Sequence, residues 1–375
     1  MKAPLVLRQK LDERERKGNL RHLRPHRPDL VDFYSNDYLG LARSPLLRER
    51  VQQVLLLHPE EGLGATGSRL LSGTSPLALA LERRLAAYHR SEAALLFPSG
   101  YAANTGFFSA VPQRGDTVFY DEAIHASIKD GIRLSLAKAY SFRHNSPDDL
   151  RRKFRLASGS AYVVVEGLYS MDGDLAPLPE LSALCLEMGA YLVVDEAHSN
   201  GLYGPGGAGL VVEMGLEEEV FARIVTFGKA LGSHGAAVLG EQVLVDFLVN
   251  FSRPFIYTTA LPLPSLLTIG CAYELLPTLT AERAAVHRLA ANLKDKLKKM
   301  GLPHQDTTSP IQGLYAENPE RLKETASFLE ERGFGVRPVL SPTVPEGKER
   351  LRVILHAFNT EQEVDELILL LENTL

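Results

Sequence analysis

Three apolar stretches of this chain end in side chains that can do acid, base or nucleophilic chemistry. The stretch AYVVVEG ends in Glu166, AYLVVDEAH ends in Asp195 and His198, and ARIVTFGK ends in Lys229. Their many β-branched residues are typical of parallel strands that are buried on both faces of a sheet. Because ligands bind at the carboxyl ends of the strands in an open α/β sheet, we expect these side chains to lie close together.

A fourth apolar stretch, AALLF, leads into the turn Ser99-Gly100-Tyr101, and the helix pattern AANTGFF follows it. Backbone N–H groups at such a helix start bind phosphate, and the hydroxyl of Thr226 can add a donor. Pyridoxal phosphate needs such donors, together with a lysine amine for its aldehyde and a carboxylate against its pyridine nitrogen. The sequence therefore predicts a pyridoxal-phosphate site in which Lys229 is the anchor and the glycines around it leave room for the cofactor.

Taken one at a time, these residues have ordinary structural roles as well. An aspartate that follows a strand, such as Asp195, often caps a helix. A single histidine such as His198 is more often a surface group than a catalytic one, and Lys229 alone is compatible with an exposed sheet edge. The pyridoxal-phosphate interpretation therefore depends on finding all of these groups in one place.

A glycine motif at residues 62–67, GLGATG, matches the G-x-G-x-x-G pattern of dinucleotide-binding proteins. That pattern must follow a strand and open a helix. Here it follows the helix-like stretch LRERVQQVLLLHPEE, and no clear helix begins for several residues after it. We therefore reject a nicotinamide site and expect a loop.

Helix-like and strand-like segments alternate from about residue 76 to 240, which indicates a doubly wound α/β sheet. After the proline-rich stretch RPFIYTTALPLP the pattern changes. It predicts helices at 281–301, 318–333 and 360–373, and short strands at 334–339 and 350–356. The predicted parts are an N-terminal segment (1–45), a large cofactor-binding domain (46–265) and a small C-terminal α+β domain (266–375).

Composition excludes several classes of protein. The 375 residues carry a formal net charge of −5, which gives no sign of a nucleic-acid partner. Two cysteines, Cys185 and Cys271, are too few for a disulfide framework or a cysteine-rich metal site, and they fit a reducing compartment. The N-terminus turns charged before an apolar core of signal-peptide length, and no apolar run is as long as a membrane span. We expect a soluble, cytoplasmic protein without a metal.

Several longer stretches resemble one known family. They include DFYSNDYLGLA, GSRLLSGTSPLALALERRLA, LLFPSGYAANTG, DEAIHASIKDG, LVVDEAHSNGLYGPGGAG, VTFGKALGSHGAAV and SPTVPEGKERLRV, and they run from about residue 31 to 356. Through them the chain resembles the α-oxoamine synthases, which are fold-type I pyridoxal-phosphate enzymes. The resemblance implies a mostly parallel central sheet in a large domain, a smaller C-terminal α+β domain, and a homodimer with shared active sites.

The resemblance also implies a role for each matching residue. Lys229 would bind the cofactor and act as acid and base at the substrate Cα, while Asp195 would pair with the pyridine nitrogen. The implied catalytic residues are Lys229, His125, Asp195 and His198. The implied cofactor-binding residues are Gly100, Tyr101, His125, Glu166, Ser170, Asp195, His198, Thr226, Lys229, Thr258 and Thr259, of which the last two would reach the phosphate in a second subunit. The implied substrate-binding residues are Arg21, Asn36, His125, Thr343 and Arg352.

Within the family, the stretches SGYAAN and GSRLLSG favour the member that condenses L-alanine with a pimeloyl thioester, of coenzyme A or a carrier protein, in biotin biosynthesis. Glycine C-acetyltransferase, which takes glycine and acetyl-CoA, would keep the same cofactor residues. A pyridoxal-phosphate aminotransferase would share Asp195 and Lys229. One departure concerns substrate recognition, because some members carry an arginine where this chain has Leu340 and Ser341, with Arg337 nearby.

Overall fold

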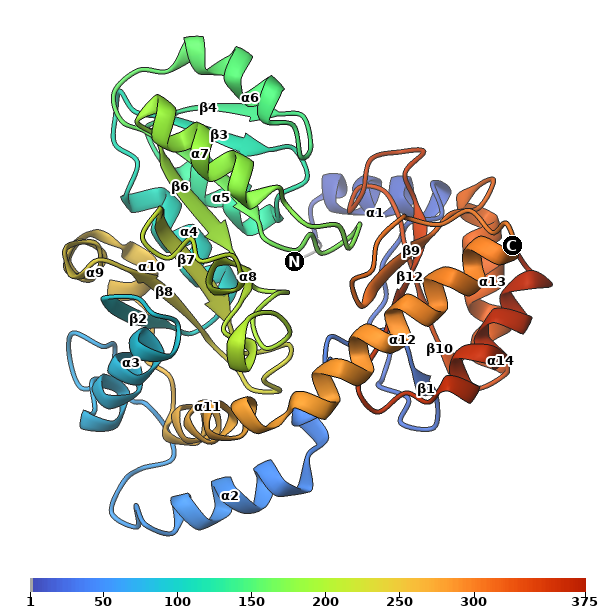
Figure 1. The fold of residues 1–375 in the computed structure, drawn as a ribbon, viewed down its shortest axis with the longest axis horizontal. Helices are drawn as coiled ribbons and strands as arrows, with labels where there is room; N and C mark the ends of the chain where they lie inside the picture. The colour runs from blue at the N-terminus through green and yellow to red at the C-terminus, as the bar shows by residue number, and fades with distance from the viewer. Residues whose placement is uncertain (1–2) are drawn as a thin grey trace.

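The computed structural model describes residues 3–375 and contains a seven-stranded sheet with the order β2-β8-β7-β6-β5-β3-β4 (Figure 1). The strands are β2 (Ala93–Phe97), β3 (Thr117–Asp121), β4 (Lys138–Phe142), β5 (Ala161–Glu166), β6 (Tyr191–Asp195), β7 (Val220–Thr226) and β8 (Ala236–Gly240). Neighbouring strands pair in parallel, except that β8 is antiparallel to both β2 and β7. The predicted fold class, an α/β fold with a mostly parallel central sheet, is confirmed.

The strand residues alternate between two buried apolar layers. Val163 and Val165 of β5 pack in one of them, whereas Val164 between them packs in the other. Because successive side chains of a strand point to opposite faces, a strand that is covered on both faces must be apolar throughout. This explains the continuous apolar runs in the sequence.

Helices supply the covering residues on each face of the sheet (Figure 1). Leu81 and Leu181 belong to the first layer, while Phe107 and Ile128 belong to the second. The helices of this lobe are α3 (Pro76–Tyr88), α4 (Gly100–Ala110), α5 (Ala126–Leu134), α6 (Pro147–Lys153), α7 (Leu178–Met188), α8 (Leu210–Glu213), α9 (Gln242–Phe251), α10 (Arg253–Ile256) and α11 (Leu263–Leu275). The two layers fix the sheet rigidly, so the positions of its strand ends are well determined.

A second lobe holds the C-terminal helices and a small antiparallel sheet with the order β11-β12-β9 (Figure 1). Its helices are α12 (Thr280–Lys299), α13 (Pro319–Glu331) and α14 (Glu361–Glu372), close to the predicted ranges. Its strands are β9 (Ile311–Leu314), β10 (Phe334–Gly335), β11 (Arg337–Val339) and β12 (Arg350–Ile354). The N-terminal strand β1 (Val31–Asp32) pairs in parallel with β10, so residues from the two ends of the sequence meet here.

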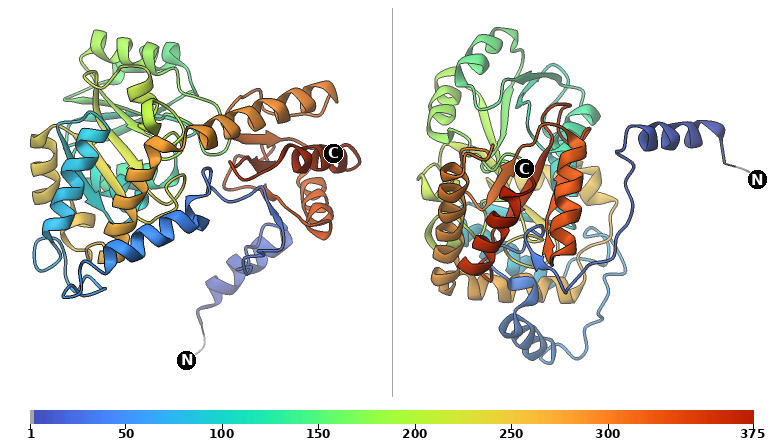
Figure 2. Two further views of the ribbon diagram at one scale, coloured as in Figure 1. Left: turned by 60° about the horizontal axis from the view of Figure 1, so that its bottom comes forward. Right: turned by 90° about the vertical axis from the view of Figure 1, so that its right-hand side faces the viewer.

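The N-terminal helix α1 (Leu5–Arg16) projects from the body of the molecule beside the C-terminal lobe and has no buried residue (Figure 2). Helix α2 (Pro45–Leu55) packs against α11, and Ser44 caps its first turn by accepting the N–H of Leu47. The rejected glycine motif at 62–67 lies in the loop between α2 and α3, as expected. Across residues 3–375, no helix has both the length and the apolar character that a membrane crossing requires.

Candidate active site

A cavity of about 310 Å³ opens at the carboxyl ends of β5, β6 and β7, next to the first residues of α4 and α5. We call it the strand-end cavity. Nine of the predicted site residues line it: Asn36, Gly100, Tyr101, His125, Glu166, Asp195, His198, Thr226 and Lys229. The structure therefore brings together the side chains that the sequence placed at separate strand ends.

The two acidic residues of the cavity lie side by side on neighbouring strands. Glu166 of β5 is in register with Asp195 of β6, and both are buried. Asp195 Oδ1 accepts the backbone N–H of Ala197 at 2.9 Å, and its Oδ2 accepts from Nδ2 of Asn104 at 2.8 Å. Burial raises the pKa of Glu166 to about 8, and the neighbouring Asp195 charge acts in the same direction. Glu166 is therefore largely protonated at neutral pH, and its Oε1 has no partner among the described residues.

Lys229 lies in the turn that follows β7. Burial lowers the pKa of its amine, although Asp195 and Glu166 act against this change. Its Nζ makes no hydrogen bond or ion pair with any residue of the described range 3–375. Gly232 closes the turn with a φ of +60°, and a Cβ there would lie 2.1 Å from the backbone nitrogen of Ala42. This glycine therefore makes room for the chain at residues 41–42, which corrects the expectation that all glycines near the lysine serve the cofactor.

Two histidines face the cavity from different elements. His125 caps α5, and its Nδ1 accepts the backbone N–H of Ser127 at 3.2 Å. His198 hydrogen-bonds through Nδ1 to the hydroxyl of Tyr38 at 2.6 Å. Burial lowers the pKa of both imidazoles, and for His198 the nearby charge of Lys229 lowers it further. Both histidines are therefore neutral at neutral pH.

The start of α4 forms the opposite end of the cavity. Ser99 caps this helix, and its Oγ accepts the N–H of Ala102. A Cβ added to Gly100 would lie 2.7 Å from Cγ2 of Thr226, so only glycine leaves the space at this point open. The first N–H groups of a helix have no partner within the helix, and together with the Thr226 hydroxyl they suit a phosphate group.

A second cavity, of about 290 Å³, adjoins the first and contains three arginines, Arg21, Arg337 and Arg352. We call it the arginine cavity. Arg21 donates from Nη2 to the hydroxyl of Thr343 at 2.8 Å. Arg352 donates from Nη2 to Oδ1 of Asn36 at 3.0 Å, and Asn36 also lines the strand-end cavity. The Asn36–Arg352 pair therefore stands where the two cavities meet.

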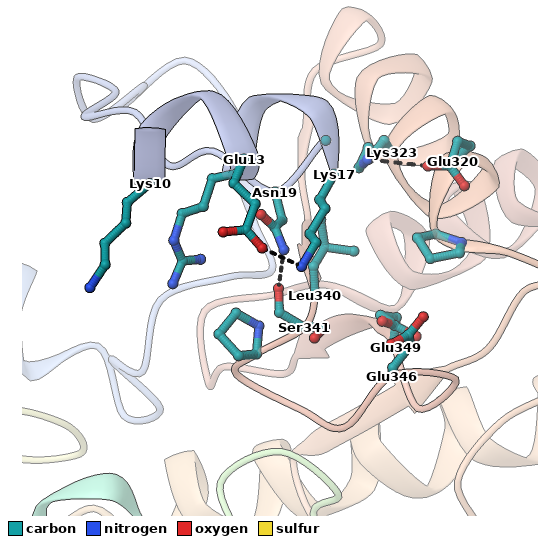
Figure 3. A pocket seen from close by; sticks show the side chains of 14 residues that line it. Lys10, Glu13, Lys17, Asn19, Glu320, Lys323, Leu340, Ser341, Glu346 and Glu349 are labelled. Carbon is teal, nitrogen blue, oxygen red and sulfur yellow. Dashed lines mark hydrogen bonds and ion pairs between the residues drawn. The ribbon is translucent and has the colours of Figure 1, made fainter. Parts of the chain in front are cut away.

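A third cavity, of about 500 Å³, lies between α1 and the C-terminal lobe (Figure 3). Lysine and glutamate side chains of both signs surround it, and Asn19 donates to the backbone oxygen of Ser341 at 3.1 Å across one side. Leu340 also lines it. Its mixed charges give it no preference for an anion or a cation, and it holds none of the predicted site residues, so it is not the candidate active site.

One known family matches this chain over most of its length. The family described as Aminotransferase class I and II matches residues 28–370. A curated relative, the 8-amino-7-oxononanoate synthase of Emericella nidulans, is 44% identical over 96% of this chain and 93% of the relative. The chain belongs to the 8-amino-7-oxononanoate synthase family.

Solved structures related to this synthase family share the fold. The 8-amino-7-oxononanoate synthase of Francisella tularensis is 26% identical, covers 92% of this chain and 97% of that chain, and has a TM-score of 0.79. Serine palmitoyltransferase from S. paucimobilis, solved with PLP and myriocin bound, is 28% identical and has a TM-score of 0.90. The match covers 99% of this chain and 96% of that chain. The agreement in fold therefore includes both lobes of the molecule.

Three residues with expected cofactor-binding roles lie outside both the strand-end cavity and the arginine cavity. Thr258 and Thr259 line a separate, small cavity beside Arg69 and Phe255. Ser170 follows β5, where its N–H donates to Glu166 at 3.2 Å and its backbone oxygen accepts from Arg352 Nε at 2.8 Å. The predicted cofactor contacts of these three residues stay predictions.

Sequence reasoning missed three residues in and around the strand-end cavity. Tyr38 bonds His198, while Asn104 and Ser127 lie behind Asp195 and His125. All three occur in stretches that carried the family resemblance, but no single-residue signal separates them from packing residues. Their importance appears only when the helices and strands that hold them are brought together.

Proposed function

We propose that this protein condenses L-alanine with a pimeloyl thioester and releases 8-amino-7-oxononanoate, CO2 and the free thiol, as a step of biotin biosynthesis. One observation carries the proposal. Lys229, Asp195 and His125 share one cavity, in a chain that is 44% identical to an 8-amino-7-oxononanoate synthase over 96% of its length. The acyl carrier is coenzyme A or a carrier protein.

The residues of the strand-end cavity fit pyridoxal phosphate. The lowered pKa of Lys229 favours the neutral amine that reacts with an aldehyde. The open space at Gly100 and the hydroxyl of Thr226 suit the phosphate. The unpartnered Oε1 of Glu166 offers a further hydrogen bond inside the cavity. We propose that the cofactor is held by Lys229, Gly100, Tyr101, His125, Glu166, Ser170, Asp195, His198 and Thr226, with Thr258 and Thr259 of a second subunit.

When bound, pyridoxal phosphate supplies an electron sink for a carbanion at the amino acid Cα and for the electron pair that decarboxylation leaves. The chain itself must then place charges and move protons. Asp195 would place its carboxylate against the pyridine nitrogen. Lys229, as a neutral amine, would remove the proton from the substrate Cα and later return one. His125 would lie against the ring face and exclude water from it.

The arginines have a separate task, which is to bind carboxylates. Arg352 presents a planar guanidinium fixed by Asn36 and Ser170, and we propose that it binds the carboxylate of L-alanine. Arg21 and Thr343 are joined by a hydrogen bond in the same cavity. We propose that this pair receives the acyl chain.

We also propose a cytoplasmic homodimer with shared active sites. Large apolar side chains near Thr258 support an interface, because Leu71 is 84% exposed and Tyr257 is 73% exposed in the single chain. The two cysteines, Cys185 and Cys271, are free and buried, which is compatible with a reducing compartment. Light scattering after gel filtration tests the dimer, and a monomeric holoenzyme would contradict it.

The test of the proposed function is the release of free thiol by the purified holoenzyme. L-alanine with pimeloyl-CoA is compared with glycine and acetyl-CoA, and Lys229→Ala serves as the control. We expect thiol release with the alanine and pimeloyl pair alone, and none from the control. A pimeloyl carrier protein replaces pimeloyl-CoA in a parallel assay.

Two results would replace this proposal with another one. Thiol release mainly from glycine and acetyl-CoA would indicate a glycine C-acetyltransferase. Conversion of L-alanine to pyruvate in the presence of an α-keto acid, without thiol release, would indicate an aminotransferase. Both would leave the roles of Lys229 and Asp195 toward the cofactor in place.

A further inference from the structure

Four side chains form a continuous hydrogen-bonded line along the wall of the strand-end cavity. Asn104 Nδ2 donates to Asp195 Oδ2 at 2.8 Å and to Ser127 Oγ at 3.0 Å. Ser127 Oγ lies 2.7 Å from His125 Nδ1. Asn104 is 3% exposed and Ser127 is fully buried, so water does not compete for these contacts. The line runs from the carboxylate expected at the pyridine nitrogen to the imidazole expected on the ring face.

Chemistry fixes the direction of each hydrogen bond in this line. The Asn104 group that faces the Asp195 carboxylate must be the NH2, because its carbonyl oxygen would be repelled there. Both hydrogens of this NH2 are then used, one on Asp195 and one on Ser127. Since Ser127 Oγ accepts from the amide, its own hydrogen is free to donate to Nδ1 of His125.

This direction selects one tautomer of His125. Its Nδ1 accepts the backbone N–H of Ser127 at 3.2 Å, besides the Ser127 hydroxyl at 2.7 Å. A nitrogen that accepts in this way carries no proton. Because burial lowers the pKa of His125, the imidazole is neutral and its single proton is on Nε2. The residue thus presents an N–H donor from Nε2.

We propose that Asn104 is a positioning residue that sets two groups at once. It holds the carboxylate of Asp195 in place, and through Ser127 it keeps His125 in the Nε2–H tautomer. Side chains behind the groups that bind a cofactor or metal commonly change affinity when they are removed. This inference rests on the cofactor part of the proposed function and does not depend on the identity of the acyl donor.

The test uses the holoenzyme and three variants. Asn104→Ala removes the contacts to both Asp195 and Ser127, whereas Ser127→Ala removes the contacts of the Ser127 hydroxyl to Asn104 and His125 and leaves the Asn104–Asp195 bond in place. Thr105→Val is the matched control, because Thr105 follows Asn104 on α4, is also buried, and bonds only to backbone oxygens of its own helix. The measurements are the cofactor dissociation constant, the pH titration of the cofactor's visible absorption, and the ¹⁵N shifts of His125, assigned by their loss in His125→Asn.

We expect Asn104→Ala to weaken cofactor binding about 10- to 100-fold. The midpoint of the absorption titration should move by about half a pH unit or more, because the Asp195 carboxylate expected at the ring nitrogen loses a hydrogen-bond donor. Ser127→Ala keeps the backbone N–H at position 127 but loses the shorter hydroxyl contact, so it should keep cofactor affinity within about twofold and move the ¹⁵N shifts of His125 part of the way from a pure Nε2–H tautomer. Thr105→Val should change neither quantity.

Three results would overturn the inference. The first is an Asn104→Ala protein whose affinity and absorption titration equal those of wild type, with only a lower melting temperature. The second is a Thr105→Val protein that shows the same changes as Asn104→Ala. The third is an unchanged His125 spectrum in Ser127→Ala, which decides the tautomer even if Asn104→Ala does not fold. A wild-type protein that bound no pyridoxal phosphate would instead refute the proposed function.

Discussion

The strand-end cavity and the arginine cavity lie side by side but are built differently. The first is formed by side chains at strand ends and helix starts, and its two acidic residues, Glu166 and Asp195, are buried. The second is formed by long side chains, and Arg21 belongs to an exposed stretch without regular structure. A sheet between two packed layers fixes the first set of atoms, whereas loops and flexible stems hold the second set.

This difference suggests a division of work. The strand-end cavity keeps atoms in one arrangement, which reaction chemistry requires. The arginine cavity holds charge near a region that can adapt, which suits the recognition of a long, flexible acyl chain. Changes in the first cavity should therefore affect the reaction rate, and changes in the second should affect mainly the apparent affinity for substrate.

The largest effect is expected at Lys229. We expect Lys229→Ala to lower kcat by about 10⁴-fold or more, because in the proposed function this one side chain both binds the cofactor and moves the Cα proton. Thiol release from L-alanine and pimeloyl-CoA measures the rate. The visible absorption band of the lysine-bound cofactor should be lost as well.

A matched control for this prediction is Lys348→Ala, because Lys348 is a lysine of a loop in the C-terminal lobe and lines none of the four cavities described above. It should keep the absorption band and the rate. A Lys229→Ala protein with even a tenth of the wild-type rate would show that the strand-end cavity is not the reaction site.

Arg352 lies where the two cavities meet, and its substitution tests how substrate binding there depends on the guanidinium group. Its Nε and Nη2 donate to different partners, Ser170 and Asn36, and a lysine cannot make both contacts. We expect Arg352→Lys to raise KM for L-alanine about 30- to 100-fold while cofactor binding stays near wild type. Steady-state kinetics with varied L-alanine measure this change.

The control for Arg352 is the other arginine of the same strand. Arg350 is buried and pairs with Asp172, and nothing in the structure places it at either cavity. Arg350→Lys should change KM for L-alanine less than about threefold. Equal effects of the two substitutions would mean that Arg352 acts through the strand rather than through the substrate.

The pH dependence of protein stability tests the environment of Glu166, which is buried in the strand-end cavity. Its folded pKa of about 8 lies above the ordinary value of 4.5. The folded state therefore binds more protons than the unfolded state between these values, and the stability that protonated Glu166 contributes is lost as pH rises toward 8. Glu166→Gln cannot ionise and should not show this loss.

We expect the unfolding free energy of Glu166→Gln to gain about 4 kcal/mol on that of wild type between pH 5 and pH 8.5. Urea unfolding of the cofactor-free proteins at the two pH values measures the difference. Glu92→Gln, which changes an exposed glutamate ahead of β2, should show no such trend. A Glu166→Gln protein that follows wild type at both pH values would contradict a raised pKa.

The contrast between the two cavities also explains which parts of the molecule could be predicted from the sequence. Apolar runs that end in Glu166, Asp195 and Lys229 indicate both the strand and the chemistry, so the strand-end cavity could be inferred from the amino-acid sequence alone. The antiparallel direction of β8 was not predicted, because its pattern AAVLG resembles that of any buried strand. Strands β3 and β4 were also missed, since β3 has only three apolar residues in a row and β4 no more than two.

The positioning residues could not be predicted for a different reason. Asn104 and Ser127 are 23 positions apart in the sequence, and they contact each other only after α4 and α5 have packed. In a sequence, an asparagine within a helix pattern does not show which distant side chain it will hydrogen-bond. Likewise, the pairing of Arg337 with Glu330 at 2.7 Å depends on how β11 meets α13.

The smallest effect is expected at Arg21, where the arginine cavity is most exposed. Arg337 is already engaged by Glu330, whereas Arg21 bonds only the neutral hydroxyl of Thr343 and has no carboxylate partner within residues 3–375. Its charge is therefore available to an anionic substrate, but in water-accessible surroundings such a contact is worth little. We expect Arg21→Ala to raise KM for pimeloyl-CoA about 3- to 10-fold, with kcat within about twofold of wild type. Arg337→Ala, the matched loss of a guanidinium already neutralised, should raise KM less. If Arg21→Ala lowered kcat instead, the arginine cavity would share the fixed geometry of its neighbour, and the division of work between the two would not hold.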